Sequence, residues 1–177
     1  MDCLKTDSLT LRKVNSLFLG AFSTILKKET LYILLNNLLS LINACSESEM
    51  HTKITYFNTL TGIAKNTCSK HTEFYGNIYP AIINYSSVEH LKKYSTSSTE
   101  EYDASNELTE SVLNLLEIYI LKLSKEVKVN IKSIVPRLLD LIFYDPNYSY
   151  DNEEKSDSNK MEVDGDYNNY DYDYEYG

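Results

Sequence analysis

The stretch Asn77-Ile78-Tyr79-Pro80-Ala81-Ile82-Ile83 decides the fold, because it places a proline inside a run of apolar residues with helical spacing. The stretch Ser133-Ile134-Val135-Pro136-Arg137-Leu138-Leu139 repeats this pattern further along the chain. A proline in the interior of a helix removes one backbone hydrogen bond and bends the helix. A bend at the same place in two stretches indicates that the chain is built from repeated helical units.

Apolar residues recur three and four positions apart on both sides of these stretches, which predicts helices that each carry one apolar face. The predicted helices cover approximately Ser8–Leu26, Thr30–Asn43, Ser48–Asn66, Thr72–Tyr85, Ser105–Ser124 and Val127–Phe143. Thr30 is expected to cap the second of them. Only 5 Gly and 3 Pro occur in 177 residues, so turn signals are too few for an all-β fold.

The predicted helices form pairs, which occupy residues 8–43, 48–85 and 105–143 of a repeat region 1–144. The second pair follows the first by about 40 residues, a spacing typical of two-helix repeats of the HEAT kind. The Ser/Thr-rich stretch 90–104 is expected to be a flexible insert before the third pair. The sequence therefore predicts an all-α, HEAT-like solenoid of about three helix pairs.

The first predicted helix carries its apolar residues on one face, which stacked neighbours are expected to bury. These residues are Leu11, Val14, Leu17, Phe18, Ala21, Phe22 and Ile25. An end repeat normally has a polar outer face, and no such capping element is evident before this helix. We therefore expect the chain to be a section of a longer repeat array.

The net negative charge of the chain resides in the C-terminal segment 145–177. Residues 1–144 carry 15 acidic and 15 basic side chains, whereas residues 145–177 carry 11 acidic and 2 basic ones. A neutral body with an acidic tail disfavours binding to nucleic acid, which requires a basic surface, and docking on anionic membranes. Segment 145–177 alternates Asp, Glu, Asn and Tyr without helical periodicity, so we expect it to be disordered.

The remaining composition favours a reducing compartment and no membrane span. The cysteines Cys3, Cys45 and Cys68 are sparse and odd in number, which does not suggest a disulfide framework. The N-terminus lacks the basic and apolar regions of a signal peptide. No run of 18 apolar residues occurs, so no membrane-spanning helix is expected.

Motifs for catalysis are absent, and we expect neither an enzyme nor a bound cofactor. The sequence has no Gly-rich phosphate loop, no serine elbow and no His-Glu-x-x-His pattern. Cys68 and His71 have a spacing that a metal site could use, but no second pair accompanies them. We expect Cys68 to be half-buried, His71 to be solvated, and both His51 and His90 to lie on the surface. The carboxylates of segment 145–177 lack the fixed ligand order of a calcium loop.

The junction between the last helix and the acidic segment carries the most specific motif. It reads Tyr-Asp-Pro-Asn-Tyr-x-Tyr-Asp and consists of Tyr144, Asp145, Pro146, Asn147, Tyr148, Tyr150 and Asp151. With Ser124-Lys125-Glu126-Val127 between the last two helices and Leu11-Arg12-Lys13 in the first, this motif resembles the cullin-associated, neddylation-dissociated family. In that family, also called TATA-binding-protein-interacting proteins, a HEAT helix ends in a similar stretch and enters a long acidic loop.

The resemblance covers about residues 8–165, and it places the chain in the N-terminal half of that family. It implies binding to an unmodified cullin with its RING subunit, in nucleus and cytoplasm, during assembly and receptor exchange of cullin-RING ubiquitin ligases. The chain differs from the family in its longer stretch 90–104 and in an acidic segment richer in Asn and Tyr. It also lacks the far repeats that displace the receptor adaptor, so we expect no receptor exchange from this chain alone. The motif marks a loop entry and identifies no contact residue.

Two other functions fit the same pattern. Nuclear transport receptors are also HEAT arrays with acidic loops, and such a fragment would bind the small GTPase of that pathway. An acidic-tail chaperone for basic proteins such as histones would depend on residues 145–177 for binding.

Overall fold

The structure is a computed structural model that describes residues 4–6 and 8–144. Within those residues it contains eight α-helices and no strand, which confirms the all-α prediction. The chain divides into two units, Met1–Pro146 and Asn147–Gly177, and every described helix belongs to the first unit. Segment 145–177, which we expected to be disordered, lies outside the described residues.

The helices follow one another with short connections. The α-helices are α1 (Leu9–Phe22), α2 (Lys28–Ala44), α3 (Met50–Thr67), α4 (Phe74–Tyr85), α5 (Val88–Lys92), α6 (Thr99–Lys122), α7 (Ser124–Lys128) and α8 (Ile131–Phe143). The 3₁₀ helices are η2 (Ser23–Ile25), η3 (Glu47–Glu49) and η4 (Cys68–Lys70). Pro80 lies inside α4 and Pro136 inside α8, as the repeated stretches predicted.

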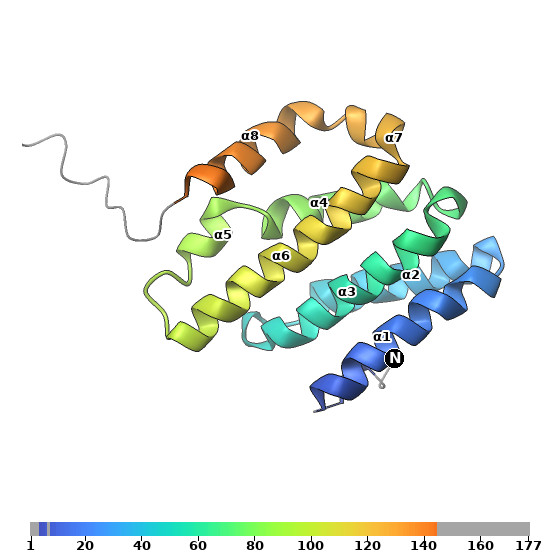
Figure 1. Cartoon of the computed structure of the whole chain (residues 1–177), viewed down its shortest axis with the longest axis horizontal. Coiled ribbons are helices and arrows are strands. Elements are labelled where there is room, and N and C mark those ends of the chain that lie inside the picture. The colour runs from blue at the N-terminus through green and yellow to red at the C-terminus, as the bar shows by residue number, and fades with distance from the viewer. Residues whose placement is uncertain (1–3, 7, 145–177) are drawn as a thin grey trace, which may run out of the picture. The chain divides into compact units, whose positions relative to one another are not determined.

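Helix α3 is the centre of the arrangement. It lies between α1 and α6, so that α1, α3 and α6 run side by side, while α2 and α4 pack behind them (Figure 1). Because α3 has neighbours on several sides, it buries residues around most of its circumference, including Thr55, Thr59 and Lys53 in addition to its apolar residues. Helix α5 contacts both α6 and α8.

The core follows from the spacing of apolar residues in α2, α3, α4 and α6. In α2 the buried residues Leu31, Leu35, Leu38 and Ile42 are three and four positions apart and form a single face. Full burial of each such side chain stabilises the fold by about 1.5–3 kcal/mol relative to exposure. Tyr119 of α6 and Phe57 of α3 are the largest residues of the same core, together with Tyr56 and Phe74.

Serine side chains mark the starts of several helices. The Ser8 hydroxyl accepts a hydrogen bond from the backbone N–H of Leu11 at the start of α1. Ser46 and Glu49 form a capping box at η3, which leads into α3. Our prediction that Thr30 caps the second helix is wrong, because α2 begins two residues earlier, at Lys28. Lys27 occupies the cap position, and its side chain makes no capping hydrogen bond.

The predicted flexible insert 90–104 is wrong for most of its length. Helix α5 extends to Lys92, and α6 begins at Thr99 instead of near Ser105. The Ser98 hydroxyl accepts a hydrogen bond from the backbone N–H of Glu101 at 3.3 Å, and this cap fixes the start of α6. The predicted last helix is also two helices, since α7 ends at Lys128 and α8 begins at Ile131.

Candidate functional site

Small and polar residues make the contact between α1 and α3. The hydroxyl groups of Ser16 and Thr59 are hydrogen-bonded to each other, and the Gly20 carbonyl accepts a hydrogen bond from the Asn66 amide at 3.2 Å. A Cβ atom at Gly20 would lie 3.0 Å from the carbonyl carbon of Gly62, so the two backbones touch. The side of α1 that packs against α3 is therefore its small and polar side.

Most of the large apolar residues of α1 consequently point to solvent, and no described helix covers them. That stacked neighbours of a longer array bury them stays a prediction. We use the name outer face of α1 for Leu11, Val14, Phe18 and Phe22, whose exposed fractions are 53, 54, 62 and 41%. Positions 11, 14, 18 and 22 share one side of a helix. The rings of Phe18 and Phe22 stack with their centroids 5.7 Å apart. Leu17 and Ile25, also predicted for this face, are exposed as well.

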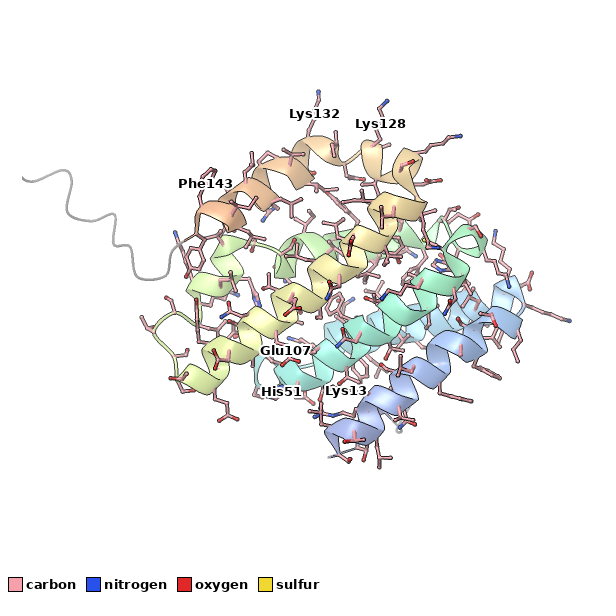
Figure 2. The ribbon with its side chains drawn as sticks, viewed as in Figure 1. Lys13, His51, Glu107, Lys128, Lys132 and Phe143 are labelled. Carbon is pink, nitrogen blue, oxygen red and sulfur yellow. The ribbon has the colours of Figure 1, made fainter. Side chains whose placement is uncertain are left out.

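A second exposed apolar surface lies on α8. We name it the α8 stripe, and it consists of Ile131, Val135, Leu139 and Ile142, all of them exposed. The opposite side of α8 holds the helix in place through buried Ile134 and through an ion pair between Arg137 and Glu89 of α5, with N and O 3.7 Å apart. Lys132 lies in the first turn of α8 and Phe143 at its last residue, while Lys128 lies at the end of the preceding helix α7 (Figure 2).

Contiguous exposed apolar residues on a helix are the usual mark of a protein interface. The outer face of α1 has the stronger pattern of the two, because it combines a stacked aromatic pair with aliphatic neighbours on one side of the helix. Aromatic side chains bury large areas on binding and are enriched among residues that dominate binding energy. The sequence signal for this orientation was the series Ser16, Gly20 and Ser23, spaced four and three apart, which marks a side of close helix contact.

The predicted metal candidates are core residues. Cys68 is buried, and burial raises the pKa of its thiol to about 11, so the thiol stays protonated and ligates metal poorly at neutral pH. His71 is 1% exposed, which corrects our expectation of a solvated histidine. Its ring packs edge-on against Phe74, and burial lowers its pKa. In the part of the chain that the structure describes, no three His, Cys, Asp or Glu side chains gather as a metal-binding group.

His90 is also buried, although we expected it on the surface. Its ring lies edge-on between Tyr85 and Tyr94, with centroid distances of 5.3 and 5.4 Å. The buried ammonium of Lys53 lies 5.3 Å from the centre of the Tyr85 ring, a cation–π arrangement that compensates part of its desolvation. These residues join α3, α4 and α5, so we assign them a packing role. His51 is exposed, as expected.

The structure describes one residue of the predicted loop-entry motif. Tyr144 follows α8 at its C-terminal cap and is partly buried. The other motif residues, Asp145, Pro146, Asn147, Tyr148, Tyr150 and Asp151, lie outside the described residues. Tyr144 therefore places the start of the motif at the end of α8.

Comparison with known proteins gives no relative for this chain. No protein-family model, no curated protein and no solved structure matches it. None of the helices in residues 4–6 and 8–144 combines the length and the apolar character that a membrane crossing requires.

Proposed function

We propose that this chain is a section of a HEAT-like repeat scaffold that binds another protein and catalyses no reaction itself. The main observation in its support is the exposed, apolar outer face of α1. In water an exposed patch of four large apolar residues is unfavourable, and covering it with a partner's apolar surface recovers about 25 cal/mol per Å² of buried apolar area. The stacked rings of Phe18 and Phe22 form a preformed anchor at its centre.

The helix arrangement supports the HEAT-like part of the proposal. Helices α1, α3 and α6 alternate in the chain with α2, α4 and α8, and the second set carries both interior prolines. Repeat arrays bury apolar faces between successive units. The outer face of α1 and the α8 stripe belong to the first and last described pairs, where a further helical unit or a partner would pack.

The resemblance of the loop-entry motif suggests which partner to test first. Proteins of the cullin-associated, neddylation-dissociated family bind a cullin that lacks its ubiquitin-like modification, together with the RING subunit. By this resemblance the chain would contribute to the assembly of cullin-RING ubiquitin ligases in nucleus and cytoplasm. The motif supports the choice of partner, and the outer face of α1 supports binding of a protein in general.

Binding of the purified full chain to an unmodified cullin C-terminal region with its RING subunit tests the proposal, with the modified cullin alongside. The double variant Phe18→Ser with Phe22→Ser should weaken binding at least tenfold, because the anchor is lost. Val129→Ser, at a residue 83% exposed away from α1, is the matched control and should bind normally. Circular dichroism checks that each variant remains helical.

Several outcomes would contradict the proposal in separable ways. Failure of the helical chain to bind unmodified cullin would remove the cullin assignment, and equal binding of the modified and unmodified forms would remove the resemblance to the cullin-associated family as its basis. Normal cullin binding by the double variant would remove the outer face of α1 from the interface. If the chain binds the small GTPase of nuclear transport, a transport-receptor fragment replaces the cullin assignment. If it binds histones and loses this binding when residues 145–177 are deleted, an acidic-tail chaperone replaces it.

A further inference from the structure

A groove of about 520 Å³ lies between α1 and α3. Its apolar wall consists of Leu9 and Leu17 from α1 and Ile54 from α3, and its polar wall includes Arg12 and Lys13. In Figure 2 Lys13, His51 and Glu107 lie together at this place, each from a different helix. The groove thus combines an aliphatic surface with two positive charges that are adjacent in sequence.

The groove is bounded by the close contact of the two helices. Gly20 meets Gly62 backbone to backbone, and the Ser16 and Thr59 hydroxyls are bonded one turn earlier. The larger side chains at positions 9, 12, 13 and 17 of α1 come before this contact and line the groove. Its shape is therefore set by rigid helices and by a glycine contact that leaves no room for a side chain.

Arg12 supplies one positive charge of the groove, and its side chain is partly exposed there. The Nε atom itself is buried, so a ligand in the groove would meet the guanidinium through its other N–H groups. An anionic acceptor at those groups would make a charge-assisted hydrogen bond. Lys13 adds a second positive charge, while Glu107 is the one acidic residue among the described residues that line the groove.

We propose that this groove binds a peptide segment of a partner protein that carries a carboxylate next to an aliphatic side chain. The carboxylate accepts a hydrogen bond from the guanidinium of Arg12 and interacts with Lys13, while the aliphatic side chain packs on Leu9, Leu17 and Ile54. A carboxylate fits better than a phosphate, because Glu107 and the apolar wall disfavour a second negative charge.

This inference goes beyond the proposed function, since the groove and the outer face of α1 are on different sides of the helix. Position 16, which faces α3, and position 18, on the outer face, lie about 160° apart around the helix axis. A variant can therefore lose binding at the groove and keep binding at the outer face of α1, or the reverse.

NMR titration of the full chain labelled with ¹⁵N and ¹³C tests the groove, because the Nε–H group of Arg12 and the methyl groups of Ile54 give their own resonances. The probe is the acetylated and amidated tetrapeptide Leu-Ala-Glu-Leu, and the comparison peptides carry Gln or phosphoserine in place of Glu. We expect a saturable shift of the Arg12 Nε–H and of the Ile54 methyl groups with the Glu peptide. The Gln peptide should bind about tenfold more weakly, because it lacks the charge that strengthens the hydrogen bond.

Variants separate the groove from general charge effects. Arg12→Gln should reduce binding of the Glu peptide about tenfold, whereas Lys65→Gln, which removes an exposed charge on α3 outside the groove, should leave it unchanged. The double variant Phe18→Ser with Phe22→Ser should still show the chemical-shift change at Arg12 when the Glu peptide is added, even if it no longer binds the protein partner. Absence of a shift at Arg12, equal affinity of the Gln peptide, or tighter binding of the phosphoserine peptide would each overturn the proposal.

Discussion

Gly20 of α1 and Gly62 of α3 are in backbone contact, and a Cβ atom on Gly20 would lie 3.0 Å from the Gly62 carbonyl carbon and 3.1 Å from its oxygen. Neither atom belongs to a side chain that could rotate away. The contact thus requires glycine at position 20, and it determines how closely α1 approaches the centre of the fold. The groove and the orientation of the outer face of α1 both depend on it.

Gly20→Ala should destabilise the chain by about 1–3 kcal/mol, because the helices must separate to admit the methyl group. Gly76→Ala is the matched control, since no atom lies within 4 Å of a Cβ at that position of α4. There the substitution should stabilise by up to about 1 kcal/mol through better helix propensity. Urea unfolding followed by circular dichroism measures both, and a Gly20→Ala variant as stable as Gly76→Ala would refute the close contact.

Stability should fall as the solution becomes more acidic, because His90 is buried in its neutral form. Burial, together with the nearby charges of Lys93 and Lys53 and against an opposing effect of Glu47, lowers the pKa of His90 from 6.5 to about 4. As the pH falls, the unfolded chain takes up a proton at His90 at a higher pH than the folded chain does. The stabilisation that His90 contributes is therefore fully present above about pH 6.5 and is lost progressively between about pH 6.5 and pH 4. The loss from pH 7 to pH 5 amounts to about 2 kcal/mol for this residue.

Urea unfolding at pH 7 and pH 5 tests this pH dependence. The variant His90→Gln should show a smaller stability difference between the two pH values than the unchanged chain. His51→Gln, at an exposed histidine, serves as the control and should preserve the full difference. If His90→Gln and His51→Gln behave alike, His90 is accessible to protons in the folded chain.

Removing the hydroxyl of Tyr119 should not destabilise the protein. Tyr119 is fully buried and its hydroxyl has no hydrogen-bond partner, so Tyr119→Phe should be neutral or stabilising by up to about 1 kcal/mol. In Tyr32→Phe, by contrast, the lost hydroxyl accepts a hydrogen bond from the Asn77 amide at 3.0 Å, and stability should fall by about 0.5–1 kcal/mol. Thermal melts rank the two variants, and the reverse order would show that Tyr119 has a partner such as a buried water.

Helix α8 should open before the rest of the fold when its one buried side chain, Ile134, is shortened. Ile134 is the one residue of α8 that is fully in the core, so Ile134→Ala should cost about 2–5 kcal/mol and speed amide exchange in α8. Val135→Ala changes the neighbouring, exposed position and should leave exchange nearly unaltered. Mass-spectrometric hydrogen exchange would count against this prediction if α3 and α6 lost protection together with α8.

The sequence was sufficient to predict helices, their rough positions and the interior prolines, because apolar spacing of three and four is a local property. The orientation of α1 was missed, since the rule that apolar faces turn inward holds only when a helix has enough neighbours to cover them. In α1 the side of Ser16 and Gly20 faces α3, and that preference comes from a backbone contact with Gly62, 42 positions away in sequence.

The start of α6 was missed for a different reason. The composition of residues 95–99 indicated a loop, yet Ser98 and Glu101 have the spacing of a capping box, and Ser98 does cap the helix. Local capping chemistry was the better guide there than composition. The groove could not have been predicted in this way, because Arg12, Ile54 and Glu107 come from three helices and meet only through the packing of α1 and α6 on α3.

The exposed stack of Phe18 and Phe22 has a consequence for the life of the protein in a cell. Chaperones and degradation machinery act on apolar surface that is normally covered, and the amount of a marginal protein follows how often it offers such surface. We expect a copy without its partner to be removed faster than a copy in complex. The cellular abundance of this chain would then follow the supply of the partner, so that no free excess accumulates.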